Sequence, residues 1–265
     1  MRGTLETKET PAQDGAVRLN RYIAQAGICS RRAADELIAR GAVRVNREVV
    51  RDLGRRVRLG DSVEVEGRAV VPRAEHAYLV LNKPTGVVTT LSDPQGRPTV
   101  AEFVPAELGR LAPVGRLDWD TSGVLILTDD GEMAHVLTHP RHGVEKTYRA
   151  TLRGQLQPAA FARLRDGGIE LDDGAKSRPA KVRVVAQRRA ESVVDITVHE
   201  GRNRQVRRMF EAVGYPVIAL ERVRFGPVAL GDLAVGSVRR PTERELRVLC
   251  ALRDEAARSR QGAAR

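Results

Sequence analysis

Cysteine, aromatic residues and long apolar runs are all scarce in this 265-residue sequence. Cys29 and Cys250 are the only cysteines, and each lies in an apolar helical pattern. Such thiols are typically small buried hydrophobic groups, and neither a disulfide nor a thiolate ligand is expected. No apolar run reaches the roughly 18 residues of a membrane helix, and residues 1–15 lack the apolar segment of a signal peptide. These absences predict a cytoplasmic protein without membrane contact.

Cofactor motifs are missing as well. The sequence contains neither GxxxxGK[ST] nor GxGxxG, so no nucleotide cofactor is expected. His135, His139 and His142 have a metal-like spacing, but no HExxH pattern or clear third ligand set accompanies them. Satisfied surface or core histidines are commoner than such sites. We therefore expect no metal and no cofactor.

Positive charge, in contrast, is abundant and unevenly distributed. The sequence has 45 Lys and Arg against 34 Asp and Glu, and residues 17–60 alone contain eleven arginines and four acids. This balance favours a polyanionic partner, although a solvated basic face would show the same excess. Arg31 and Arg32 fall in the first turn of a predicted helix, where the macrodipole disfavours cations. A bound phosphate would offset that cost.

Periodicity divides the chain into two predicted domains. Two short helices, the first ending at Gly27 and the second capped by Ser30, precede several valine-rich strands. The polar segment Glu66–Glu75, which contains Pro72, is expected to be a flexible connection. The predicted segments are a disordered tail at residues 1–15, a small basic domain at 16–73, a larger α+β domain at 74–253 and a frayed end at 254–265.

The stretch Ala112–Gly131 places a carboxylate beside a buried strand. The branched run Val124–Leu127 is short and apolar, so it predicts a strand buried on both faces. Asp118 lies in the polar loop that enters this strand, a place where catalytic groups often sit on a firm scaffold. A loop whose Asp, Ser and Thr side chains merely bond their own backbone would give the same local pattern.

Two later segments place polar side chains near apolar faces. Residues 146–153 alternate as a strand, on which Tyr148 points inward. An inward tyrosine is usually a core residue whose hydroxyl finds a partner. Residues 204–213 predict an amphipathic helix, and Arg207 flanks its apolar stripe. Because a buried arginine needs an anion, Arg207 is a candidate for a functional ion pair.

Three motifs occur in the order found in RNA pseudouridine synthases of the RsuA/RluB kind. They are LNKPTGVVTT (81–90), GRLDWDTSGVLILTDDG (115–131) and EGRNRQVRRMFEAVG (200–214). Residues 19–50, LNRYIAQAGICSRRAADELIARGAVRVNREVV, resemble the αL RNA-binding module, named after a small-subunit ribosomal protein, that precedes the catalytic domain in these enzymes. The resemblance implies an α+β fold in which this module is followed by a mixed, mostly antiparallel sheet flanked by helices.

The resemblance also implies roles for individual residues. Asp118, the acid of GRLD, would be the catalytic carboxylate that converts uridine in rRNA to pseudouridine, as nucleophile on the sugar or as base on a ribose proton. Tyr148, in EKTY, would stack on the target base. Arg207 would pair with Asp118 and keep it ionised. Lys83 could touch RNA, but an architectural role is favoured. The remaining predicted site residues are Arg31, Arg32, Arg116, Arg202, Arg204 and Arg208 as RNA contacts, and Leu220 as a pocket wall.

Three alternatives accompany this interpretation. Hydrolysis of a glycosidic bond would use a second carboxylate, and Asp120 is available, although Thr121 and Ser122 make it look like a turn residue. A non-enzymatic ribosome-assembly factor would explain the charge but not the acidic GRLD motif. Within the family, DPQGRPTV (93–100) and Arg204-Gln205 resemble the RluB branch, which modifies large-subunit rRNA, and the RsuA branch, on small-subunit rRNA, is its rival. We predict a monomeric rRNA pseudouridine synthase.

Overall fold

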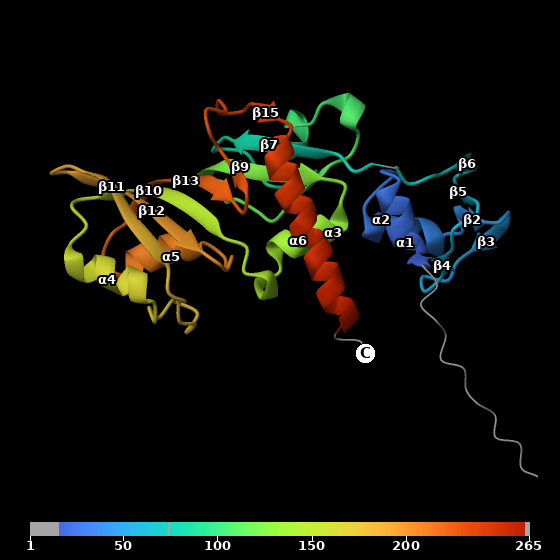
Figure 1. The fold of residues 1–265 in the computed structure, drawn as a ribbon. Helices are drawn as coiled ribbons and strands as arrows, with labels where there is room; N and C mark the ends of the chain where they lie inside the picture. The colour runs from blue at the N-terminus through green and yellow to red at the C-terminus, as the bar shows by residue number, and fades with distance from the viewer. Residues whose placement is uncertain (1–15, 74, 263–265) are drawn as a thin grey trace, which may run out of the picture. The chain divides into compact units, whose positions relative to one another are not determined.

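The computed structural model describes residues 16–73 and 75–262, which divide into two compact units between Glu75 and His76 (Figure 1). The predicted disordered tail at residues 1–15 lies outside the described residues. No described helix combines the length and the apolar character that crossing a bilayer requires. The first unit contains α1 (Leu19–Gln25), α2 (Arg31–Ala39), β1 (Val17–Arg18), β2 (Val43–Val45), β3 (Glu48–Val50), β4 (Arg56–Val57), β5 (Val63–Val65) and β6 (Arg68–Ala69).

The first unit has the two helices and the small sheet that the sequence predicts. The Ser30 hydroxyl caps α2 by accepting a hydrogen bond from the Ala33 N–H at 3.1 Å. Strands pair in the order β3-β2-β5-β6, and valines from them pack against Ile23 and Ile38. The segment expected as a flexible connection is partly built into this unit, because it contributes β6 and the buried Val70.

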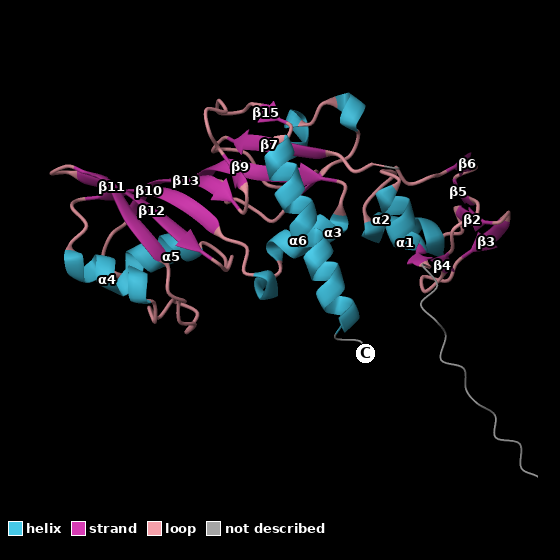
Figure 2. Ribbon diagram, in the orientation of Figure 1, coloured by secondary structure: helices cyan, strands magenta, loops and turns pink. Residues whose placement is uncertain are grey.

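The second unit is a nine-stranded sheet with helices on its faces, as far as the chain is described (Figure 2). The strand order is β11-β12-β10-β13-β9-β7-β15, and β8 and β14 pair with β9 and β13. Only the β13–β9 pair within this described sheet is parallel, so the expected mixed, mostly antiparallel sheet is confirmed. The strands are β7 (Tyr78–Lys83), β8 (Ala112–Pro113), β9 (Thr121–Thr128), β10 (Lys146–Arg153), β11 (Lys181–Gln187), β12 (Glu191–Val198), β13 (Val217–Phe225), β14 (Val228–Ala229) and β15 (Val238–Arg239).

The helices of the second unit cover different parts of the sheet. They are α3 (Gly131–Thr138), α4 (Pro158–Asp166), α5 (Gln205–Ala212) and α6 (Glu243–Gly262), with 3-10 turns at Val100–Phe103, Ala106–Leu108 and Pro140–His142. Residues of α3 and α6 form one core cluster with β9. Residues of α4 and α5 form another with β10 and β12. The pocket that contains Asp118 lies at the junction of β9, β10, β13 and α5.

Strand β9 is buried on both faces, as its apolar run predicts. Val124 and Ile126 pack in the cluster that contains α3 and α6. Leu125 and Leu127 point the other way, into a cluster with β7 and the loop that follows it. All four side chains are 0 % exposed. This anchored strand gives the preceding GRLD loop a fixed end.

The structure corrects two helix boundaries. Arg204 does not lie on the helix face, because it is the residue before α5 and has a left-handed backbone with φ of 47°. Helix α6 continues to Gly262, so residues 254–262, expected to be frayed, are helical. Its Ala, Arg, Glu and Gln residues have high helix propensity, Ala256 is buried, and Arg253 pairs with Asp130 at 3.1 Å. The predicted capping box of Thr242 and Glu245 at the start of α6 is confirmed.

Gly123 allows β9 and β13 to approach closely where they pair. A Cβ at this position would lie 2.3 Å from the carbonyl oxygen and 2.6 Å from the nitrogen of Arg222, and φ is +104°. We expect Gly123→Ala to lower the free energy of unfolding by about 2 to 4 kcal/mol, because overpacking and backbone strain add. Gly131→Ala is the matched control, since a Cβ there meets no atom within 4 Å. Equal denaturation midpoints for the two variants would contradict this interpretation of Gly123.

Candidate active site

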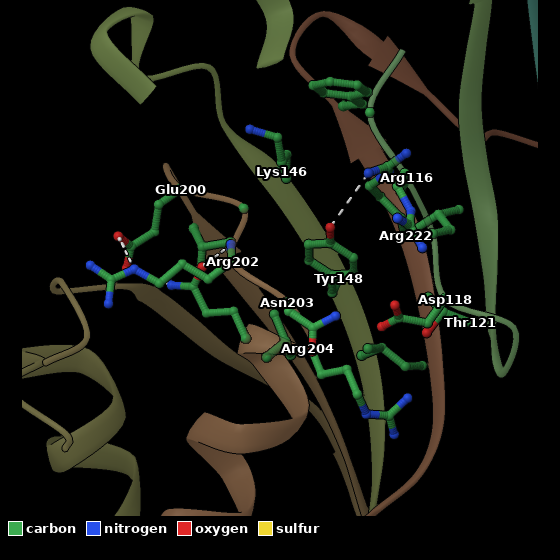
Figure 3. Close-up of a pocket in the computed structure, with 18 of the residues that line it drawn as sticks. Arg116, Asp118, Thr121, Lys146, Tyr148, Glu200, Arg202, Asn203, Arg204 and Arg222 are labelled. Atoms are coloured by element: carbon green, nitrogen blue, oxygen red, sulfur yellow. Dashed lines mark hydrogen bonds and ion pairs between the residues drawn. The ribbon is translucent and has the colours of Figure 1, made fainter. Parts of the chain in front are cut away.

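A pocket of about 350 Å³ lies among the GRLD loop, β10, β13 and the segment before α5 (Figure 3). Its volume is within the range of about 300 to 1,000 Å³ that ligand sites occupy. The structure brings six of the predicted site residues to its wall: Arg116, Asp118, Tyr148, Arg202, Arg204 and Leu220. Arg207 and Arg208 are on α5 and do not line the pocket, and Arg31 and Arg32 are exposed in the first unit.

The Asp118 carboxylate points into the pocket (Figure 3). Its backbone carbonyl accepts from the Thr121 N–H at 3.1 Å and from Lys83 Nζ at 3.3 Å. Its carboxylate, however, forms no hydrogen bond or ion pair with another residue in the described part of the chain. A turn residue of the kind considered above would bond its own backbone through that carboxylate. The side chain is therefore held by its main chain and left available to a ligand.

Lys83 supports the GRLD loop through hydrogen bonds to backbone carbonyls. Its side chain is 0 % exposed, and its ammonium donates to the carbonyls of Pro84 at 2.8 Å, Thr121 at 3.1 Å and Asp118 at 3.3 Å. Burial lowers the pKa of Lys83 to about 8, and the charges of Asp118 and Asp120 partly offset this shift. The structure thus supports the architectural role over contact with RNA.

Thr89 fixes the same loop through Leu117. The Thr89 hydroxyl donates to the Leu117 carbonyl at 2.6 Å and accepts from the Leu117 N–H at 3.2 Å. Lys83 and Thr89 both belong to the LNKPTGVVTT motif. That motif therefore positions the residues immediately around Asp118, a function of Thr89 that no local sequence signal indicates.

Asp120 is the acid that Arg207 contacts, which corrects the expected pairing of Arg207 with Asp118. Arg207 Nη2 lies 3.2 Å from Asp120 Oδ2 and donates to the Asp120 carbonyl at 2.8 Å. Arg204 adds two hydrogen bonds of 3.1 Å to the same carboxylate. The turn that ends at Thr121 directs Asp120 towards α5 and Asp118 into the pocket. The result is a clamp between the GRLD loop and the start of α5.

This clamp decides the chemistry open to Asp120. Burial alone would raise the pKa of Asp120, but the hydrogen bonds from Arg204 and the charges of Arg207 and Arg204 outweigh burial and lower it. A carboxylate held ionised by two arginines is unsuited to be the general acid of a hydrolytic pair. The hydrogen bonds to Asp120 raise the pKa of Arg204, whereas burial lowers the pKa of Arg207. The charge of Asp118 favours the charged form of both guanidinium groups.

Tyr148 and Leu220 line the pocket from neighbouring strands. Tyr148 is half-buried, and its hydroxyl accepts a 3.5 Å hydrogen bond from Nη1 of Arg222. Arg222 is itself 2 % exposed, and its Nε donates to the Val124 carbonyl at 2.7 Å. Sequence reasoning missed Arg222. Its spacing could have indicated it. Arg222 is two residues after Leu220 on a predicted strand, so the two side chains lie on the same face.

The other predicted RNA contacts differ in their surroundings. Arg116 is exposed at the pocket, and Arg202 lines it while lying 3.5 Å from Glu200. Arg208 lies outside the pocket wall, and its guanidinium pairs with Asp172 and Asp173. Its side chain is only 13 % exposed. These contacts favour a structural role for Arg208 in place of the expected contact with RNA.

The histidines form a cluster of rings. The ring centroids of His135 and His139 are 4.9 Å apart in an edge-to-face arrangement, and His142 lies near both. Over residues 16–73 and 75–262, no group of three or more His, Cys, Asp or Glu side chains is arranged to hold a metal ion. The expectation of a metal-independent reaction stays a prediction.

Comparison with known proteins decides the family. Residues 77–212 match the family model for RNA pseudouridylate synthase. The chain belongs to the RNA pseudouridine synthase family. It is therefore an isomerase, and the resemblance seen in the three motifs is confirmed. Residues 17–63 match the S4 domain, so the first unit of this synthase is the predicted RNA-binding module.

Curated relatives and a solved structure agree with this assignment. The synthase is 44 % identical to the ribosomal large subunit pseudouridine synthase B of Bacillus subtilis, over 89 % of this chain and 97 % of that protein. It is 45 % identical to an RNA pseudouridine synthase of Mycobacterium leprae, over 89 % of this chain and 93 % of that protein. A crystal structure of a pseudouridylate synthase matches with a TM-score of 0.64 and 34 % identity, over 88 % of this chain and 99 % of that chain.

Proposed function

We propose that this synthase isomerises a uridine of large-subunit rRNA and that Asp118 is the carboxylate that acts on the ribose. The observation that carries the proposal is the contrast among the acids near the pocket. Asp120 is clamped by Arg204 and Arg207, and Glu200 is held by Arg202 and by Gln205 Nε2. The carboxylate of Asp118 points into the pocket and has no such partner among the described residues.

The reaction requires few protein groups other than this carboxylate and a closed pocket. The bond from ribose C1′ to N1 breaks, the uracil turns, and C1′ joins C5. The proton on C5 is released and N1 gains one, so no water or electrons are consumed. Asp118 acts either as nucleophile at C1′ or as base for a ribose proton. Tyr148 stacks on the flipped base, which replaces stacking worth about 1 to 3 kcal/mol, and Leu220 bounds the space in which the base turns.

In this mechanism Arg204 and Arg207 are positioning residues. Arg207 is buried and binds Asp120 through both its carboxylate and its carbonyl. Arg204 binds the same carboxylate from a strained backbone, a state that costs on the order of 1 to 3 kcal/mol and tends to occur at functional sites. Together they fix the loop on which Asp118 lies and keep positive charge near it.

Support for the large-subunit target comes from relatives and motifs. The similar proteins of Bacillus subtilis and Pseudomonas aeruginosa are both named ribosomal large subunit pseudouridine synthase B. The segment DPQGRPTV and the Arg204-Gln205 pair also resemble that branch. We propose that the S4 domain and the catalytic domain both contact rRNA, because the target must be recognised through RNA shape as well as sequence. We also propose that the synthase acts as a monomer.

Mapping pseudouridines in both rRNAs, with and without the gene, tests this proposal. The expected result is the loss of pseudouridine at one or more large-subunit positions in the deletion strain and its return on complementation. A loss confined to small-subunit rRNA would place the enzyme with the RsuA branch and overturn the target. An unchanged map would overturn the rRNA substrate altogether.

Arg31 and Arg32 provide a test of RNA binding by the S4 domain. Both are exposed in the first turn of α2, and this first turn contains no acid. Replacing both with Gln is expected to weaken rRNA binding and to reduce the slope of log K against log salt by up to about 1.4 to 1.8, at roughly 0.7 to 0.9 per phosphate contact. The double Lys variant keeps the charge and is the matched control. An unchanged slope in the Gln variant would show that these arginines do not contact phosphates.

A further inference from the structure

Two buried cations lie together at one end of the pocket, away from the arginines that clamp Asp120. Lys146 is 8 % exposed and Arg222 is 2 % exposed, and both line the pocket. They share the ring of Phe225, with Lys146 Nζ 5.3 Å and Arg222 Cζ 4.7 Å from its centroid. In Figure 3 they lie towards the hydroxyl end of Tyr148, while Asp118 lies beside the same side chain.

An irregularity in the sheet creates this arrangement. Strand β10 pairs Lys146 with Phe225 and Tyr148 with Arg222, with a register shift between the two pairs. Residues 222 and 225 are an odd number apart, so in a regular strand they would face opposite sides. The extra residue at the shift, Val223, brings both to the pocket face. Consistently, Val223 and Arg224 both line a hollow on the opposite face of the sheet.

Neither cation forms an ion pair with an acid within the described chain. Lys146 Nζ donates to the Val144 carbonyl at 3.1 Å. Arg222 donates to the Val124 carbonyl and the Tyr148 hydroxyl, and its Nη2 is buried without a partner. Burial, together with the charge of Arg222, lowers the pKa of Lys146 to about 8. Buried charge without an anion is costly, and so is a buried donor without an acceptor.

We propose that Lys146 and Arg222 form a phosphate subsite that binds a phosphodiester adjacent to the target uridine. A phosphate oxygen would accept from Arg222 Nη2 and from Lys146 Nζ, forming charge-assisted hydrogen bonds. A uracil carbonyl could accept one of these bonds but would leave both positive charges uncompensated. The subsite fixes the ribose that follows or precedes this phosphate, and so sets how C1′ is presented to Asp118. The inference rests on the catalytic role proposed for Asp118.

The test uses an RNA fragment that contains the target uridine found by mapping. The phosphodiester on the 5′ side or on the 3′ side of that uridine is replaced by a neutral methylphosphonate, one at a time. With the wild-type enzyme, one of the two replacements is expected to lower kcat/KM at least about tenfold, as for loss of one partner of a buried charge pair. With Lys146→Met, which keeps the apolar stem, the same replacement should change kcat/KM by less than about twofold, since the partner is already absent.

Controls separate this proposal from folding and from the proposed function. Lys176→Met removes an equal charge from an exposed residue outside the pocket and should leave the wild-type response to each methylphosphonate intact. Thermal unfolding shows whether Lys146→Met is folded. If it is not folded, inorganic phosphate serves as the probe with the wild-type enzyme. Phosphate should inhibit turnover of the intact fragment competitively and should not inhibit turnover of the fragment with the sensitive methylphosphonate. Equal rates for all three fragments with the wild-type enzyme, or equal losses in wild type and Lys146→Met, would overturn the subsite. Turnover of the intact fragment tests the proposed function separately.

Discussion

Replacing Lys83 with Met is expected to lower kcat by about 100-fold or more, because small displacements of a catalytic group have costs of this size. Methionine fills a similar volume but removes the ammonium that binds the carbonyls of Pro84, Asp118 and Thr121. The loop that carries Asp118 then loses its support from β7. Affinity for rRNA should change little, since Lys83 is 0 % exposed and cannot contact RNA. Single-turnover rates and filter binding measure the two effects.

The protonation of Lys83 gives a second readout for the same variant. Its pKa is about 8 in the folded protein against an ordinary value of 10.5. Between these values the unfolded chain binds more protons than the folded one, so the free energy of unfolding should rise with pH. Lys146, with a pKa of about 8, contributes in the same direction. Urea titrations from pH 8 to pH 10 should show a smaller rise for Lys83→Met than for wild type, and an equal rise would contradict the burial of a charged Lys83.

The predictions that succeeded depend on local pattern. The short length and the branched side chains of Val124–Leu127 predict a strand buried on both faces, and all four side chains are completely buried in the structure. The caps at Ser30 and Thr242 follow from a side chain and a backbone N–H three residues apart. Placing Asp118 in the loop before β9 needed only the order of elements. The role proposed for its carboxylate came from the resemblance. The structure added that this carboxylate lines the pocket and has no partner in the described part of the chain.

What the sequence could not supply depends on contacts between distant segments. Arg207 and Asp120 are 87 residues apart in the chain, and which of the two loop acids receives the guanidinium depends on the turn at Thr121. Lys146 and Arg222 lie together only because of the register shift between β10 and β13. This shift brings Phe225 to the same face of the sheet as Arg222. No periodicity in either strand predicts that shift. The end of α6 was misjudged for another reason, because its polar composition concealed the contacts of Arg253 and Ala256.

Asp118→Asn should have the largest effect on turnover of any single substitution. It keeps the shape of the side chain and removes its charge, so the nucleophile or base is lost and turnover should fall by at least about a thousandfold. Binding should persist or tighten slightly, because affinity for RNA depends on basic residues and one negative charge has gone. Asp120→Asn is the matched control. It weakens the clamp to Arg204 and Arg207 but leaves the pocket carboxylate in place, so it should retain far more turnover.

The most direct measurement of this claim is tritium release from 5-tritiated uridine in rRNA under single-turnover conditions, with binding followed in the same samples. Trp119 is the sole tryptophan, is 48 % exposed and follows Asp118 directly, so its fluorescence reports RNA at the pocket. The expected result is a normal fluorescence titration for Asp118→Asn with tritium release at background. Release within tenfold of the wild-type rate, at saturating enzyme, would show that Asp118 does not perform the chemistry.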